Sequence, residues 1–116
     1  MIEKGFRIAG RDIQRLTPHA GACFATDRIT VDGERVGYMY RQKAAPGSNV
    51  SGWTFLSGTE SQEYLDKAAN IGIYSVNTIA NYDPDIIPFL DAPFGSAFAR
   101  DAKTGKSVAA DAPPED

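Results

Sequence analysis

The segment from Gly21 to Asp91 constrains the fold most, because strand-like runs rich in β-branched and aromatic residues alternate there with turn-forming residues. Within it, Asp32-Gly33 separates two strand-like runs, 25–31 and 34–42. Asp-Gly tolerates the positive φ angles of a type I′ turn, so the sequence predicts a β-hairpin. The register of that turn places apolar side chains on both faces of the hairpin. Such a strand pair suits a sheet covered on both faces, or partly covered by a partner.

The remainder of the segment predicts further strands and two helices. A third strand over 52–56 places Trp53 and Phe55 on one face, and a β-branched run predicts a fourth strand over 71–76. Thr59 and Gln62 form a capping-box pattern that predicts a helix to about Ala69. We expect the inward side chains of this helix to be Tyr64, Leu65 and Ala68.

A second short helix is predicted after Asp83, which is a suitable N-cap, with Pro84 at the first helical position. Pro88 removes a hydrogen bond inside it, so we expect a bent or 3₁₀-like element. A last strand over 94–100 and a turn over 103–106 follow. Helices and strands do not alternate as βαβ units, which favours an α+β fold with a mostly antiparallel twisted sheet of about five strands and two short helices.

The chain length of 116 residues predicts one domain. We place it at 21–108, after a weakly structured N-terminal extension over 1–20 and before a disordered tail over 109–116. Within the extension, a short strand at 6–8 and one helical turn at 12–16 are the expected elements.

Charge and cysteine content exclude several classes of partner. The net charge is −3, and Lys and Arg do not cluster, so nucleic acid and anionic membranes are not expected partners. Cys23 is the single cysteine, which excludes a disulfide within the chain. No apolar run is long enough to span a bilayer, and the first residues do not resemble a signal peptide. We therefore expect a cytoplasmic protein.

No group of residues carries a recognisable catalytic or metal-binding pattern. His19 and Cys23 are four residues apart, but no cysteine-enzyme motif surrounds them. One His and one Cys do not make a structural zinc site. Asp83, Asp85 and Asp91 are explained more simply by capping and solvation than by a cation site. We predict no enzyme activity, no metal and no cofactor.

Tyr38, Tyr40, Arg41 and Trp53 have two interpretations that the residues alone leave open. They either fill and line the core, or they form a recognition surface, since Trp, Tyr and Arg are enriched at binding hot spots. Trp53 favours the core, whereas Tyr40 and Arg41 fit both interpretations because their side chains end in polar groups.

Several blocks resemble one family of small bacterial immunity proteins, the thirty-third in the series from polymorphic toxin systems. The blocks are Gly21-Ala-Cys-Phe-Ala-Thr-Asp27, Val36-Gly-Tyr-Met-Tyr-Arg41, Ser51-Gly-Trp53-x-Phe55-x-Ser-Gly58-x-Glu60 and Asn77-Thr-Ile-Ala-x-Tyr-Asp-Pro84. The resemblance covers about residues 20–101. It implies an α+β domain that binds and neutralises a cognate protein toxin, with no cofactor and no activity of its own.

Combining the residues and the resemblance, we predict a non-catalytic, toxin-neutralising binding module that occludes its toxin. The predicted partner-binding residues are Tyr40, Arg41, Trp53, Glu60, Tyr64, Tyr82, Asp83 and Asp85. The alternative is a stand-alone small-molecule-binding or regulatory domain, with a pocket between the hairpin and the Trp53 strand. The sequence does not settle the oligomeric state.

Overall fold

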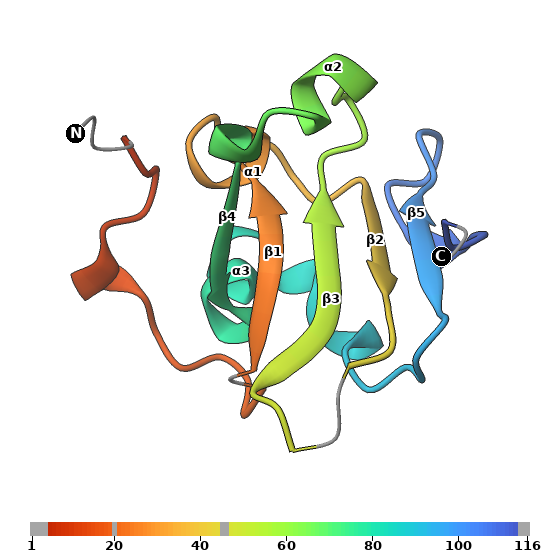
Figure 1. Cartoon of the computed structure of the whole chain (residues 1–116), viewed down its shortest axis with the longest axis horizontal. Helices are drawn as coiled ribbons and strands as arrows, with labels where there is room; N and C mark the ends of the chain where they lie inside the picture. The colour runs from red at the N-terminus through yellow and green to blue at the C-terminus, as the bar shows by residue number, and fades with distance from the viewer. Residues whose placement is uncertain (1–4, 20, 45–46, 114–116) are drawn as a thin grey trace.

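The computed structural model describes residues 5–19, 21–44 and 47–113, and its centre is one six-stranded sheet (Figure 1). The spatial order is β4-β1-β3-β2-β5-β6. β1 and β3 run parallel, and the other neighbouring pairs are antiparallel. The α+β fold is thus confirmed, with one strand more than the sequence predicts. The strands are β1 (Ala22–Thr26), β2 (Tyr38–Arg41), β3 (Val50–Leu56), β4 (Ile71–Ser75), β5 (Ala97–Arg100) and β6 (Ser107–Ala109).

Among the described residues, short helices cover only one face of this sheet. Helix α3 (Val76–Tyr82) and the 3₁₀ helix η3 (Pro84–Phe89) lie behind the sheet in Figure 1. We call the face that they cover the closed face and the other the open face. The remaining helical elements of the described chain lie at the ends of strands or in the N-terminal segment. They are α1 (Asp27–Thr30), α2 (Gln62–Leu65), η1 (Gly10–Asp12) and η2 (Ala68–Asn70).

The core lies between the closed face and α3 with η3. Trp53 and Phe55 stack on β3 with ring centroids 5.9 Å apart, and both are buried. The indole N–H of Trp53 donates to the carbonyl of Leu90 at 3.3 Å, so its polar atom is satisfied inside the core. The prediction that Trp53 and Phe55 share one face of a strand is confirmed. Buried partners come from both layers, including Cys23, Ala25, Ile29, Met39, Val76, Ile79, Ile86 and Leu90.

The predicted hairpin across Asp32-Gly33 is wrong. β1 ends at Thr26, α1 follows, and β3 lies between β1 and β2, so the two runs do not pair. Gly33 has a φ of +77° and its N–H donates to the carbonyl of Ile29 at 3.1 Å. The glycine therefore ends a helical turn. An Asp-Gly pair satisfies the left-handed requirement of a helix end as well as that of a hairpin turn.

The predicted helix from Thr59 to Ala69 is also wrong in its start and its length. The N-cap is Ser61, whose hydroxyl accepts the N–H of Tyr64 at 3.1 Å, and α2 ends at Leu65. Thr59 stays outside the helix because the carboxylate of Glu60 folds back to accept the N–H groups of Ser57 and Gly58. Tyr64 and Leu65 are half-buried and Ala68 is exposed.

Other predicted elements are confirmed within one to three residues at each end. Strands β3 and β4 lie where expected, the last predicted strand corresponds to β5, and a turn occupies 102–104. The Asp83 carboxylate accepts the N–H of Asp85 at 3.1 Å and caps η3, a 3₁₀ helix that contains Pro88. The sequence interpretation missed α3, which Ser75 caps by accepting the N–H of Thr78 at 3.1 Å.

The described parts of both ends contact the domain. The expected strand at 6–8 and helical turn at 12–16 do not form, although η1 overlaps the latter at Asp12. Instead, the N–H groups of Gln14 and Leu16 donate to Asn81 and Asn77 of α3. At the other end, Ala109, the first residue of the predicted tail, is the last residue of β6, which pairs with β5. Residues 1–4, 20 and 114–116 of these predicted end segments lie outside the described residues.

Candidate protein-binding face

Strand alternation builds the open face from two rows of side chains. Each strand sends every second side chain to this face, and pairing aligns those side chains across the sheet. The first row is Ile73, Phe24, Thr54, Tyr40 and Ala97. The second row contains Ile71 and Thr26 on β4 and β1, then Leu56, Tyr38, Ala99 and Val108 on β3, β2, β5 and β6. Neither row contains a charged side chain.

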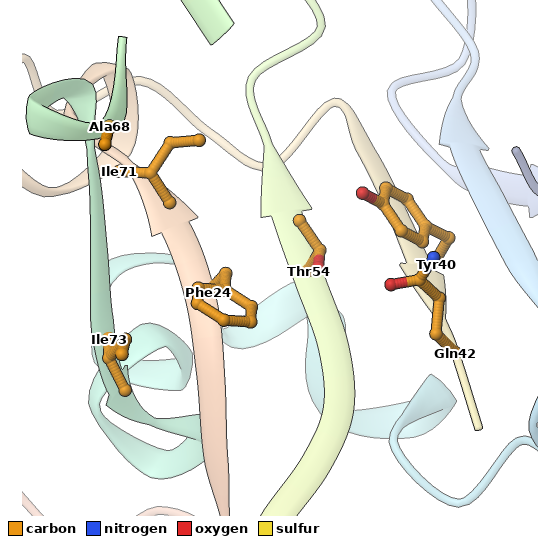
Figure 2. A pocket seen from close by; sticks show the side chains of 7 residues that line it. All are labelled: Phe24, Tyr40, Gln42, Thr54, Ala68, Ile71 and Ile73. Atoms are coloured by element: carbon orange, nitrogen blue, oxygen red, sulfur yellow. The ribbon is translucent and has the colours of Figure 1, made fainter. Parts of the chain in front are cut away.

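A groove of about 450 Å³ runs along the first row (Figure 2). Figure 2 shows the side chains of Phe24, Ile71 and Ile73 on one side and Tyr40 and Gln42 on the other, with Thr54 between them. Phe24 is 44% exposed and Ile73 is 69% exposed. Contiguous exposed apolar side chains of this kind mark interaction sites on soluble proteins.

A loop that Glu60 holds in place lies at one end of the open face. The hydroxyl of Thr26 donates to the Glu60 carboxylate at 2.5 Å, and the N–H groups of Ser57 and Gly58 donate to it at 2.8 and 2.9 Å. Partial burial raises the pKa of the Glu60 carboxyl, but these hydrogen bonds outweigh that effect and lower the pKa below its ordinary value. The ionised carboxylate of Glu60 thus ties the loop over 57–60 to β1.

The structure brings Tyr40, Glu60 and Tyr64 to the open face or its rim. Tyr40 lines the groove, and its ring lies 5.7 Å from that of Tyr38. Tyr64 on α2 is half-buried, with the guanidinium of Arg28 at 4.9 Å from its ring.

Arg41 and Trp53 support the fold in this structure. Trp53 is 1% exposed, which confirms the core interpretation of this residue. The guanidinium of Arg41 donates to the carbonyls of Ser51 and Ala92 at 2.9 and 2.8 Å, and it lies 5.8 Å from the Trp53 ring. Arg41 is therefore a link between β2, β3 and the segment after η3.

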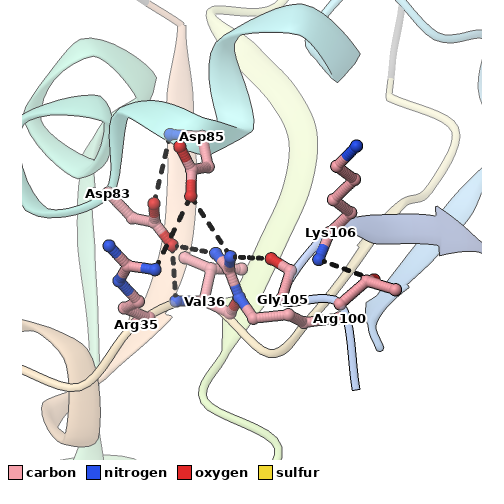
Figure 3. Close-up of polar contacts among 8 residues, drawn as sticks. Arg35, Val36, Asp83, Asp85, Arg100, Gly105 and Lys106 are labelled. Carbon is pink, nitrogen blue, oxygen red and sulfur yellow. Dashed lines mark hydrogen bonds and ion pairs between the residues drawn. The ribbon is translucent and has the colours of Figure 1, made fainter. Parts of the chain in front are cut away.

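Tyr82, Asp83 and Asp85 lie away from the open face. Asp83 is 2% exposed, and its carboxylate accepts the Arg100 guanidinium at 2.6 Å and the N–H of Val36 at 3.0 Å (Figure 3). Asp85 accepts from the same guanidinium at 3.2 Å. The hydroxyl of Tyr82 accepts the N–H of Ile8 at 3.3 Å. The eight predicted residues thus do not form one surface.

The residues that sequence reasoning missed are Phe24, Ile71 and Ile73. The signal for Phe24 is its position between Cys23 and Ala25, two small residues that face the core on the same strand. For β4 the signal is isoleucine at 71 and 73, both on the open face. The sequence predicts apolar groups on both faces of a strand pair, but it places them on a hairpin that does not form.

The described residues do not assemble reactive groups. Cys23 is 2% exposed, and burial raises the pKa of its thiol to about 12, so the nucleophilic thiolate is scarce at neutral pH. The imidazole of His19 pairs with Asp91, with Nε2 3.2 Å from the carboxylate oxygen. Within 5–19, 21–44 and 47–113, no three His, Cys, Asp or Glu side chains are grouped so as to hold a metal ion. Over the same ranges, no helix has both the length and the apolar character to cross a membrane.

The fold and the open face together define a small α+β domain with an exposed apolar sheet face. The family model of the immunity protein Imm33 domain matches residues 23–110, most of the chain, and the chain therefore belongs to this immunity protein family. Membership gives the chain, in general terms, the toxin-neutralising binding role of an immunity protein. No curated protein and no solved structure matches the chain.

Proposed function

We propose that this protein neutralises a cognate protein toxin in the cytoplasm without chemistry of its own, by seating its open face on the toxin and occluding a surface that the toxin needs. The observation that carries the proposal is the exposure of Phe24 and Ile73 on an uncharged sheet face, in a chain of an immunity protein family. This face refines the predicted partner-binding set: it keeps Tyr40, Glu60 and Tyr64, and adds Phe24, Ile71 and Ile73.

The open face has the composition that protein interfaces use at their centre. Aromatic side chains in a desolvated centre carry most of the binding free energy, and charged residues are depleted there. Phe24 and Ile73 supply apolar area, while Tyr38 and Tyr40 combine an apolar ring with a polar end. Glu63 and Asp66 are exposed on and just after α2, at the rim. They favour encounter with a basic toxin surface, in agreement with the net charge of −3.

Co-expression with the toxin encoded beside this protein tests the proposal. Wild-type protein restores growth, and Phe24→Asp abolishes that protection because a carboxylate at the centre of an apolar interface is left desolvated and unpaired. Leu16→Asp is the matched control, since Leu16 is 41% exposed and lies in the segment beside α3. Circular dichroism and melting temperatures establish that both variants remain folded. Full protection by Phe24→Asp would reject the open face as the binding site, and killing despite wild-type protein would reject the function.

The groove also favours a second candidate, the binding of a small apolar ligand, because its lining is concave and mostly apolar with Tyr40, Gln42 and Thr54 as polar groups. A ligand that binds only the folded state raises the melting temperature. A thermal-shift screen with metabolite fractions therefore separates the candidates. A shift that Phe24→Asp removes supports ligand binding, and the absence of any shift counts against it.

A further inference from the structure

β4 is an edge strand whose outward hydrogen-bonding groups can be assigned. The N–H of Val76 donates to the carbonyl of Gly21, and β4 pairs with β1 in antiparallel register from Ala22↔Ser75 to Thr26↔Ile71. In an antiparallel ladder, hydrogen-bonded pairs alternate with non-hydrogen-bonded pairs. Gly72 and Tyr74 therefore direct their backbone groups toward β1. Ile71, Ile73 and Ser75 direct theirs to the open edge.

Two of these six outward groups are already satisfied. The N–H of Ile71 donates to the carbonyl of Ala68 in η2. The carbonyl of Ser75, the N-cap residue of α3, accepts the first hydrogen bond of that helix. Four groups remain that no other described residue pairs: the carbonyl of Ile71, the N–H and carbonyl of Ile73, and the N–H of Ser75. The edge thus offers two donors and two acceptors in a row.

These four groups are self-complementary about a two-fold axis that runs midway between Ile73 and Ile73 of a second copy. An antiparallel second copy of β4 in this register pairs Ile73 with Ile73 of that copy through two reciprocal hydrogen bonds. The same register brings the N–H of Ser75 to the carbonyl of Ile71 of the second copy, and the reverse. Every free group of the edge is then satisfied.

We propose that this protein self-associates into a symmetric dimer through antiparallel β4–β4 pairing, which joins two sheets into one. The sequence of β4, Ile-Gly-Ile-Tyr-Ser, has no charged residue to repel a copy of itself and no proline to block pairing. Soluble proteins usually protect a free edge with lysine, proline, a bulge or a covering loop. β4 has no lysine, proline or bulge, and the N-terminal segment beside it in Figure 1 makes no backbone hydrogen bond to it among the described residues. The pairing also sets Ile73, the most exposed of the large apolar side chains in the described chain, beside its copy, so that the two side chains cover each other in part while the open faces of the two sheets stay uncovered.

The facing of Ile73 with its own copy makes the proposal testable with the protein alone. Sedimentation equilibrium of wild type over a range of concentrations should show a monomer–dimer equilibrium. Ile73→Asp and Ile73→Lys each place like charges opposite one another, so each should weaken the dimer by about tenfold or more. An equimolar mixture of the two variants should recover association, because the charges that then face each other are opposite.

Val108→Asp is the control for the other sheet edge, where Val108 is 49% exposed on β6. It should dimerise as wild type does. A wild-type protein that is monomeric at every concentration overturns the proposal, as does a dimer that Ile73→Asp leaves intact or that Val108→Asp breaks. Monomeric wild type whose β4 amides become protected from hydrogen exchange only with the toxin would assign the edge to the toxin instead. Because these readouts contain no growth assay, they stand apart from the proposed toxin neutralisation.

Discussion

The two faces of the sheet carry similar residue types and opposite degrees of burial. On the closed face, Phe55 and Trp53 are covered by α3 and η3, and their exposed fractions are 0% and 1%. On the open face, Phe24 and Ile73 lie on β1 and β4 with 44% and 69% of their surface exposed. Hydrophobicity alone therefore does not separate core from binding surface in this protein. The separation comes from where the chain places its short helices.

The rims of the faces differ in their polar groups as well. Behind the closed face, the Asp83–Arg100 pair joins the start of η3 to β5 and to the backbone before β2 (Figure 3). At the open face, Glu60 fixes a loop but leaves the groove uncovered (Figure 2). One arrangement stabilises the fold, and the other keeps an apolar surface available.

Phe55→Ala should give the largest change in stability. The residue is fully buried, and removal of a buried phenylalanine ring costs about 3–5 kcal/mol through lost transfer energy and the cavity left behind. Urea unfolding followed by fluorescence of Trp53 measures the loss. A change below 1 kcal/mol by the same measurement would mean that the closed face is not the main core.

Asp83→Ala should come next, with a loss of about 3 kcal/mol, because it leaves the largely buried Arg100 guanidinium and the N–H of Val36 without their partner. Arg100→Ala and the double variant complete a double-mutant cycle. We expect strong coupling between the two positions. Additive losses would show that the pair does not join η3 to β5 energetically.

Glu60→Gln should have a smaller and pH-dependent effect. The folded-state pKa of Glu60 is lowered, so the carboxylate stabilises the fold above the ordinary pKa of the group, and this stabilisation is lost as the pH falls through the folded-state pKa. Because the carboxylate is partly exposed, we expect about 1 kcal/mol or less at neutral pH. Urea unfolding of wild type and variant at neutral and acidic pH measures the effect, and the two free energies of unfolding should become equal in acid. A difference in the free energy of unfolding that persists in acid would contradict a stabilising role of the ionised Glu60 carboxylate.

Phe24→Ala should have the smallest effect on stability, below about 1 kcal/mol, since the ring is nearly half exposed in the unbound protein. Its matched counterpart is Phe55→Ala on the adjacent strand, in the same assay. Equal losses for the two phenylalanines would remove the distinction between the faces. A stable Phe24→Ala protein that binds toxin less well would sharpen it.

Local signals in the sequence predicted the elements that depend on neighbouring residues. Asp83 followed by Pro84 identified η3, and the β-branched run after Asn70 identified β4. The hairpin failed because the pairing of β1 is decided by contacts distant in sequence, with β3 and β4. The predicted start of α2 is wrong for the same reason, since Glu60 is held partly by Thr26, 34 residues earlier.

The candidate site was predicted less well than the fold. Of the predicted partner-binding residues, aromatic and charged type alone did not distinguish Tyr40, which lines the groove, from Trp53 and Asp83, which are buried. Phe24 resembles a core residue in sequence, and it is exposed because no helix of the described residues lies over the open face (Figure 1). Where the helices lie depends on contacts distant in sequence, which a local pattern does not reveal.

The strand order also bears on how quickly the protein becomes able to act. β1 lies between β3 and β4, so the centre of the sheet joins residues 22–26 to residues 50–56 and 71–75. Sheets dominated by such distant pairings fold in milliseconds to seconds rather than microseconds. During synthesis, β1 has no partner until β3 has left the ribosome, and the row that contains Phe24 is incomplete until β4 and β5 follow. A newly made chain therefore acquires its open face only when nearly the whole domain has emerged.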